Sequence, residues 1–156
     1  MTSLNEGEKV PSFKAVDQFG KTISTTDLKG KPYLIYFYPQ DDTPTCTEQA
    51  CNLRDNFAEL KKAGLTVIGI SPDNADSHEK FSSKFKLPFS IIADPKHQII
   101  KKFGVWGEKQ MFGNKYMGLH RTSFLIDGKS TIRKIFLKPR SKQHSQEVLK
   151  AFDTLG

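Results

Sequence analysis

The sequence predicts an α/β fold with a mixed central sheet. Tyr33 to Tyr38 and Leu65 to Ile70 are apolar at nearly every position, which is typical of strands covered on both faces. A helical pattern separates them, as expected for a parallel strand-helix-strand unit. Asp127-Gly128 lies between two later strand-like segments and indicates a hairpin, and so antiparallel strands. With 156 residues the chain is long enough for one domain, 1–156, and too short for two of ordinary size.

The first half of the chain supplies a hairpin and the longest helix. Segments 13–17 and 21–24 flank Gln18-Phe19-Gly20 and predict an N-terminal β-hairpin. Between the two buried strands we expect one helix from Cys46 to Ala63, because its apolar residues recur on a single stripe. Gly64 fits the left-handed position just past the end of that helix.

The second half supplies shorter elements. Segment 107–118 has three glycines and no periodicity, so we interpret it as a loop that is either mobile or binds a ligand. The expected elements are a helix at 77–85, a strand at 90–93, a helix at 97–103, strands at 122–126 and 131–136, and a helix at 143–155. This order matches a thioredoxin-like fold with an N-terminal β-hairpin and a central strand-helix insertion.

Composition favours a cytoplasmic protein with redox or metal chemistry. The N-terminus, Met1 to Lys9, is polar and acidic, and the longest apolar run is far too short to cross a membrane. In the reducing cytoplasm, cysteines more often serve catalysis or metal binding than a structural disulfide. Cys46 and Cys51 are the two cysteines, and a five-residue spacing without a second ligand pair is unsuited to zinc. We therefore expect no metal.

The net charge of +7 is concentrated near the C-terminus. Between Lys129 and Lys150 there are seven basic residues and one acidic residue, Glu147. We interpret this as a solvated basic face, with attraction to nucleic acid or to an acidic protein as the alternative. Because no recognition motif accompanies the basic residues, we expect no nucleic acid as a partner.

Cys46 is placed for redox chemistry if a helix begins near it. Unpaired backbone N–H groups and the positive end of the helix dipole then favour the ionised thiolate, and Thr43 or Thr45 could cap the helix. Ionisation alone cannot make a fast enzyme, so substrate positioning and stabilisation of a leaving group must contribute. The alternative is that Cys46 is a small core residue on the apolar stripe.

The motif Pro39-x-x-x-Thr43-x-x-Cys46 resembles the active-site signature of the peroxiredoxins. The neighbouring motifs resemble the bacterioferritin comigratory protein or peroxiredoxin Q subfamily. These motifs are Cys46-x4-Cys51 with Leu53-Arg54-Asp55, Phe103-Gly104-Val105-Trp106-Gly107-Glu108-Lys109 and His120-Arg121-Thr122-Ser123-Phe124-Leu125-Ile126-Asp127. The resemblance covers nearly the whole chain.

The resemblance implies a peroxidase that reduces hydrogen peroxide and organic hydroperoxides without a cofactor. Cys46 would be the peroxidatic nucleophile and Cys51 the resolving thiol, joined as an intramolecular disulfide. Thr43 would hydrogen-bond the peroxide, Pro39 would shield the pocket, and Arg121 would stabilise the thiolate and the departing oxygen. The resemblance also implies a monomer recycled by a thioredoxin-like protein. From the shortness of the apolar runs we expect no membrane partner. The alternative is a thiol-disulfide exchange or redox-dependent interaction module, against which stands the lack of a Cys-x-x-Cys motif.

A continuous helix would keep the two cysteines apart. Residues five apart in a helix have Cα atoms about 8.7 Å apart, whereas a disulfide needs them closer than about 7 Å. We therefore expect the start of the Cys46 helix to unwind in each catalytic cycle.

Several neighbouring residues carry weaker expectations. The family usually has glycine at the position of Thr45, where a β-branched residue is costly if φ is positive. We expect Asp41 and Asp42 to point to solvent. Of the histidines, His120 is interpreted as a structural hydrogen-bonding residue, and the other three are interpreted as surface residues: His78, His97 and His144.

Overall fold

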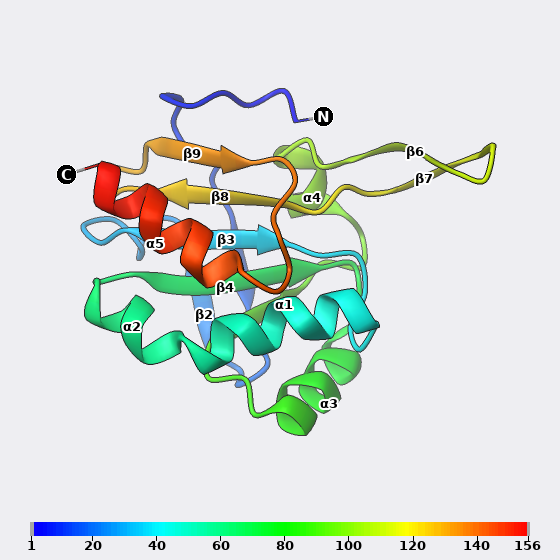
Figure 1. Cartoon of the computed structure of the whole chain (residues 1–156), viewed down its shortest axis with the longest axis horizontal. Coiled ribbons are helices and arrows are strands. Elements are labelled where there is room, and N and C mark those ends of the chain that lie inside the picture. The colour runs from blue at the N-terminus through cyan, green and yellow to red at the C-terminus, as the bar shows by residue number, and fades with distance from the viewer. Residues whose placement is uncertain (1, 156) are drawn as a thin grey trace.

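The computed structural model of the chain describes residues 2–155 and has a five-stranded sheet at its centre (Figure 1). The strand order is β5-β4-β3-β8-β9. The bounds are Tyr33–Phe37 for β3, Thr66–Ser71 for β4, Ser90–Ala93 for β5, Thr122–Ile126 for β8 and Ile132–Phe136 for β9. Strand β3 pairs in parallel with β4 and β4 with β5, while β8 runs antiparallel to both β3 and β9. The predicted mixed sheet is confirmed.

Strand β3 is buried at every position because the sheet is covered on both faces. Its alternate residues point to two separate cores, as the period of a strand requires. Tyr33, Ile35 and Phe37 join one core, and Leu34 and Tyr36 join the other. The continuous apolar run read from the sequence thus has a direct structural cause.

Each core is closed by a different set of elements. The first lies beneath the N-terminal hairpin, β1 (Lys14–Val16) paired with β2 (Thr22–Ser24), and helix α4 (Gln98–Lys102). The second lies beneath α1 (Pro44–Asp55), α3 (Ala75–Phe85) and α5 (His144–Thr154). Figure 1 shows α1 and α5 side by side on the near face of the sheet.

The helix predicted from Cys46 to Ala63 is two helices. Helix α1 ends at Asp55 and α2 spans Phe57–Lys62, with Asn56 between them in a non-helical conformation. The Asn56 side chain donates a hydrogen bond of 2.9 Å to the Asn52 carbonyl, so it competes with the backbone for a helical acceptor. Gly64, as predicted, has the left-handed φ of +89° that follows the helix end.

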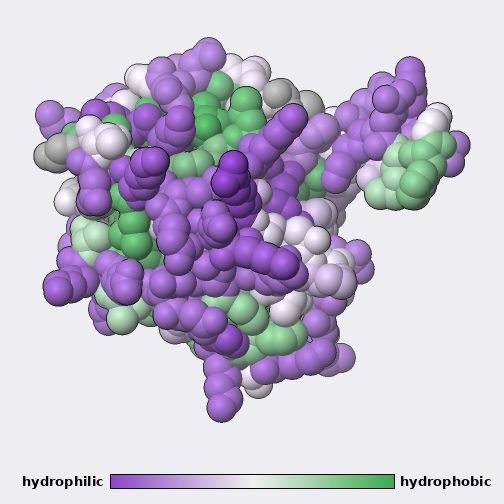
Figure 2. Space-filling model, in the orientation of Figure 1, coloured by the Kyte–Doolittle hydropathy of each residue, from purple (hydrophilic) through white to green (hydrophobic). Residues whose placement is uncertain are grey.

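The segment predicted as a loop at 107–118 is instead a β-hairpin. Strands β6 (Trp106–Met111) and β7 (Asn114–Leu119) pair in full register around a two-residue turn, Phe112-Gly113. Both turn residues have positive φ, which is the geometry that two-residue hairpin turns favour. The hairpin projects from the body (Figure 1), so most of its side chains are exposed and show no alternation. Figure 2 shows an apolar tip, and exposed Met111 and Phe112 lie at the turn of this hairpin.

The remaining predicted elements are present within a few residues of their expected bounds. Helix α3 begins at Ala75, before the predicted start, because the Asn74 side chain accepts a 2.8 Å hydrogen bond from the Ser77 N–H and caps it. Among residues 2–155, no helix combines the length and the apolar character needed to span a membrane.

Candidate active site

The first turn of α1 places Cys46 at the positive end of the helix. Thr43 is the N-cap residue, and its Oγ1 accepts a hydrogen bond of 3.3 Å from the Cys46 N–H. Pro44 occupies the first helical position, where a missing N–H costs nothing. No acidic residue lies in this first turn. The local electrostatics therefore favour a negative charge on the Cys46 sulfur.

Arg121 completes the environment of the thiol. Its Nη2 donates a hydrogen bond of 3.0 Å to the Cys46 Sγ. Arg121 precedes β8, and because Phe37 pairs with Thr122, the start of β8 lies beside the end of β3, from which the chain leads into α1. The sheet register thus brings the predicted arginine to the predicted cysteine across 75 residues of sequence.

Gln49 holds the other arm of the guanidinium and was missed by the sequence analysis. It is fully buried, and its Oε1 accepts a hydrogen bond of 2.5 Å from Arg121 Nη1. Residues three apart on a helix share a face, so a polar residue three positions after Cys46 was the available signal. Arg121 is therefore fixed between a sulfur and an amide oxygen.

Two buried polar atoms beside this site have no hydrogen-bond partner among residues 2–155. They are Nε2 of Gln49 and the hydroxyl of Tyr36. Burial raises the pKa of Tyr36 well above its ordinary value, and negative charge on Cys46 and then on Asp41 acts in the same direction. Buried donors normally find an acceptor. Among the described residues these two donors are exceptions to that rule.

Cys51 lies in the same helix but is not bonded to Cys46. Both cysteines are free thiols, with Cys46 1% exposed and Cys51 half-buried. Burial raises the pKa of the Cys51 thiol, and the charge of Arg54 partly offsets this. The Cys46 sulfur thus has a cationic hydrogen-bond partner, whereas burial favours the neutral form of the Cys51 thiol.

Pro39 and Thr45 flank the thiol in the connection from β3 to α1. Pro39 is half-buried, and Thr45 is exposed in the first turn of α1. Thr45 has a helical conformation without positive φ, so a β-branched residue is not strained there. The residue of this connection with positive φ is Asp42, at +58°.

Comparisons with known proteins identify the family. The AhpC/TSA family model matches residues 7–135. A putative peroxiredoxin bcp of Haemophilus influenzae is 46% identical over 149 residues, which cover 96% of each chain. The peroxiredoxin Bcp of Bacillus subtilis is 39% identical over 154 residues, which cover 99% of this chain and 98% of the relative. This chain belongs to the AhpC/TSA family of peroxiredoxins.

Solved structures agree with the family and with the predicted fold. The bacterioferritin comigratory protein of Xanthomonas campestris was solved as a trapped intermediate in a study of alkyl peroxide reduction. It matches with a TM-score of 0.88 at 26% identity, over 99% of each chain. A cysteine-to-serine mutant of PrxQ from Xylella fastidiosa has a TM-score of 0.92 at 23% identity over 99% of each chain, which supports the fold alone. The thioredoxin-like fold and the subfamily resemblance are confirmed, and the protein is a thiol-dependent peroxidase.

Asp41 of this peroxiredoxin does not point to solvent, so that expectation is wrong. It is 8% exposed and accepts hydrogen bonds from the Tyr38 hydroxyl at 2.7 Å and from Ser77 at 2.8 Å. Its Oδ2 also lies 2.7 Å from Nδ1 of His78, which is likewise buried rather than on the surface. The contacts of Asp41 with Ser77 and His78 connect the loop before α1 to helix α3. Asp42 does point outward and pairs with Lys84 at 2.8 Å.

His144 was also expected on the surface and is instead fully buried at the start of α5. Its Nε2 lies 2.8 Å from the Ser123 hydroxyl, and its Nδ1 lies 3.1 Å from Glu147. Burial lowers the pKa of His144, and the positive charge of Arg121 acts in the same direction, while Glu147 opposes both. The imidazole therefore joins β8 to α5 in its neutral form at neutral pH.

The buried His144 should make the stability of this peroxiredoxin depend on pH. Below about pH 6.5, the ordinary histidine pKa, the unfolded chain takes up a proton that folded His144 resists. The free energy of unfolding therefore falls as the pH falls through that range. Urea denaturation at pH 8 and pH 5 should show a larger loss for the wild type than for His144→Asn. Equal losses in both proteins would contradict this assignment.

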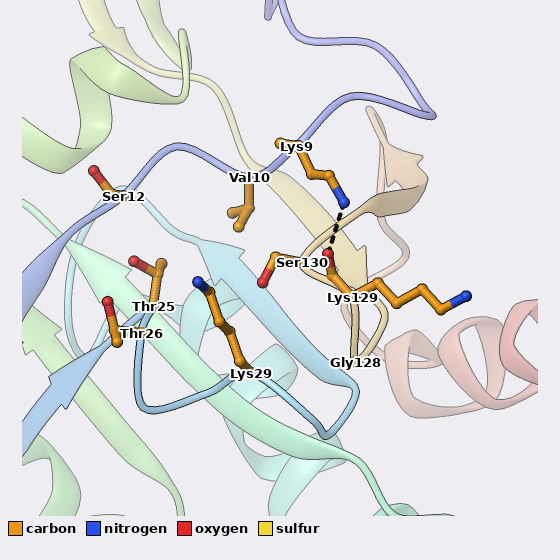
Figure 3. A pocket seen from close by; sticks show the side chains of 9 residues that line it. All are labelled: Lys9, Val10, Ser12, Thr25, Thr26, Lys29, Gly128, Lys129 and Ser130. Carbon is orange, nitrogen blue, oxygen red and sulfur yellow. Dashed lines mark hydrogen bonds between the residues drawn. The ribbon is translucent and has the colours of Figure 1, made fainter.

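A cavity elsewhere in the molecule is distinct from the peroxiredoxin site. It has a volume of about 470 Å³ and is lined in part by Lys9, Lys29 and Ser130 (Figure 3). Residues 128–130 follow the end of β8, whereas Arg121 precedes its start, so the two sites lie at opposite ends of that strand. The Lys9 ammonium already donates to the Lys129 carbonyl at 2.9 Å.

Proposed function

We propose that Cys46 is the peroxidatic nucleophile of this enzyme. The observation that carries the proposal is the 3.0 Å hydrogen bond from Arg121 Nη2 to Cys46 Sγ at the N-terminus of α1. A guanidinium and a helix terminus on one sulfur stabilise a thiolate, which is the attacking species in thiol chemistry. We also assign Arg121 and Thr43 the role of hydrogen-bonding the peroxide substrate.

The first chemical step is transfer of one oxygen from the hydroperoxide. The Cys46 thiolate attacks the nearer peroxide oxygen, an S–O bond forms, and the O–O bond breaks. The sulfur is oxidised to a sulfenic acid, and the departing alkoxide or hydroxide takes a proton and leaves as alcohol or water. Negative charge thus moves from the sulfur to the departing oxygen, where Arg121 and the Thr43 hydroxyl can donate hydrogen bonds.

Hydrogen peroxide and organic hydroperoxides are the proposed substrates. The Xanthomonas campestris relative was studied for alkyl peroxide reduction, which favours organic hydroperoxides for this chain as well. Cys46 is 1% exposed, and half-buried Pro39 lies in the short connection that precedes its helix. Pro39 is assigned the role of excluding water from the thiolate.

The second step forms the disulfide between Cys46 and Cys51. The Cys51 sulfur attacks the sulfenic acid, an S–S bond forms, and the oxygen leaves as water. In a helix, the two Cα atoms are about 8.7 Å apart, which exceeds the reach of about 7 Å for a disulfide. Helix α1 therefore unwinds between these residues before the bond closes. Unwinding also exposes Cys51 and removes the burial that raises its pKa.

A thioredoxin-like dithiol protein is proposed to reduce the disulfide and return both thiols. The enzyme is proposed to work as a cytoplasmic monomer without a cofactor or metal, and with neither nucleic acid nor membrane as a partner. Reduction by a second dithiol balances the cycle, because one peroxide consumes one pair of thiol hydrogens.

The test is a coupled assay with NADPH, thioredoxin reductase, thioredoxin and hydrogen peroxide or cumene hydroperoxide. The wild type should consume NADPH in proportion to the peroxide added. Cys51→Ser should reduce one equivalent of peroxide in a single turnover and then lose most of its thioredoxin-dependent turnover. If Cys51→Ser matched the wild type in steady state, the resolving role would be wrong. If the wild type reduced protein disulfides but not peroxides, the exchange module would be the better assignment.

A further inference from the structure

Asn52, the residue directly after Cys51, joins helix α1 to helix α5. Its Nδ2 donates hydrogen bonds to the Lys142 carbonyl at 3.0 Å and to Oε1 of Gln146 at 3.2 Å. Its Oδ1 accepts a hydrogen bond of 2.7 Å from the Ser145 N–H. One side chain therefore satisfies groups on both sides of the start of α5, where the two helices lie side by side (Figure 1).

Helix α5 depends on this outside contact because it has no side-chain cap of its own. The N-cap position holds Gln143, whose side chain makes no capping hydrogen bond. An uncapped helix leaves backbone N–H groups without partners, and Asn52 accepts from one of them. Asn52 thus supplies a capping hydrogen bond to α5 from a different helix.

We propose that Asn52 is a positioning residue that holds α1 in the helical form of the dithiol enzyme and is released when the Cys46–Cys51 disulfide forms. The inference rests on the proposed function, since it requires that disulfide. Closing the bond requires α1 to unwind between Cys46 and Cys51, and in this proposal Asn52, the next residue, moves together with Cys51. Displacement of Asn52 breaks its three hydrogen bonds to α5 together.

The contacts of Asn52 therefore oppose disulfide formation. A contact made only in the dithiol form stabilises that form against the disulfide, so its loss favours oxidation. Removing a helix cap and its accompanying hydrogen bonds is expected to raise the equilibrium constant for disulfide formation about tenfold. It should also speed the conversion of sulfenic acid to disulfide, because the unwound form of α1 becomes more populated.

The experiment compares wild type with Asn52→Ala at equilibrium with glutathione. Oxidised glutathione and protein dithiol exchange to give protein disulfide and two reduced glutathione molecules, and acid quenching with thiol labelling gives the ratio of protein forms. The expected tenfold change corresponds to a reduction potential more negative by about 30 mV. A change in the reduction potential separates a positioning role from general destabilisation, because general destabilisation lowers the stability of the dithiol and disulfide forms equally.

Asn74→Ala is the matched control. Asn74 caps α3 in the same way, with Oδ1 accepting from the Ser77 N–H at 2.8 Å, but it lies on a helix that holds neither cysteine. It should lower the free energy of unfolding and leave the potential unchanged. Asn52→Asp keeps an acceptor for Ser145 and loses both donors, so it should fold and give a change between wild type and Asn52→Ala.

The outcomes separate the inference from the proposed function. If the equilibrium constants for disulfide formation in the Asn52 variants lay within twofold of the wild-type value, the inference would be overturned. Asn52 would then stabilise the dithiol and disulfide forms equally. An equal shift in Asn74→Ala would also overturn it. Failure of the wild type to form a Cys46–Cys51 disulfide, seen by peptide mapping, would instead overturn the proposed resolving step on which it rests.

Discussion

Replacing Cys46 by serine is expected to abolish peroxide reduction, leaving less than about one-thousandth of the wild-type turnover. A serine hydroxyl is not ionised by one arginine and a helix terminus, and it cannot be oxidised to the equivalent of a sulfenic acid. The change is nearly isosteric at a position that is 1% exposed, so the fold should persist. The measurement is the initial rate of peroxide consumption in the coupled thioredoxin assay.

The matched control for this substitution is Cys51→Ser, the same chemical change five residues further along α1. Cys51→Ser should keep the first turnover. Because both variants replace cysteine by serine, a difference in their first turnover reflects the role of the cysteine and not the type of substitution. Circular dichroism should show both variants folded. If Cys46→Ser retained a substantial fraction of activity, the nucleophile would be another residue and the assignment of the site would fall.

Replacing Arg121 by glutamine is expected to slow reaction with peroxide by about 10² to 10³-fold, the usual cost of losing one preorganised donor to a developing oxyanion. We expect the loss to have two parts. Arg121 donates to the Cys46 Sγ in the resting enzyme, and we assign it to the departing oxygen in the transition state. The measurement is the second-order rate constant for oxidation of Cys46 under single-turnover conditions. Arg121→Lys should recover only part of the rate, because one ammonium lacks the fork that contacts both Sγ and Gln49.

Arg133→Gln is the control for loss of a guanidinium. Arg133 pairs with Asp127 on the far end of the β8–β9 hairpin and contacts nothing at the thiol. Its rate constant should match that of the wild type. An Arg121→Gln variant with an unchanged rate constant would show that the 3.0 Å contact to sulfur has no catalytic consequence.

The sheet and the central constellation were readable from sequence because strong local patterns specify them. The unbroken apolar run at 33–38 is typical of a strand covered on both faces, and the structure buries all of β3. Asp127-Gly128 correctly predicted the β8–β9 hairpin. The pairing of Cys46 with Arg121 came from motif resemblance, and no local pattern specifies it. Its physical cause is the antiparallel register that places Thr122 opposite Phe37.

What the sequence did not predict depends on contacts between distant segments. Asp41 and His78 looked like surface residues because nothing local shows that they meet each other from a loop and a helix 37 residues apart. His144 is buried for the same reason, by its contact with Ser123. The β6–β7 hairpin was read as a loop because a strand pair exposed on both faces has no alternation, and Phe112-Gly113 is an unusual turn sequence.

Gln49 and Asn52 are intermediate between the features that the sequence predicts and those that it does not. Both are polar residues on the helix that carries the thiols, and the three-residue spacing from Cys46 was an unused signal for Gln49. The partner of each is distant in sequence, with Arg121 contacting Gln49 and the start of α5 contacting Asn52. Helical periodicity could nominate them, but only the fold assigns what they hold.

We propose that peroxide oxidises the Cys46 sulfur, which Arg121 holds. Its most direct test is mass spectrometry of the reduced protein after one equivalent of hydrogen peroxide, with peptide mapping and a sulfenic-acid trap. We expect a Cys46–Cys51 disulfide in the wild type and a trapped sulfenic acid at Cys46 in Cys51→Ser. Oxidation confined to methionines, or a sulfenic acid at Cys51 with Cys46 still reduced, would contradict it.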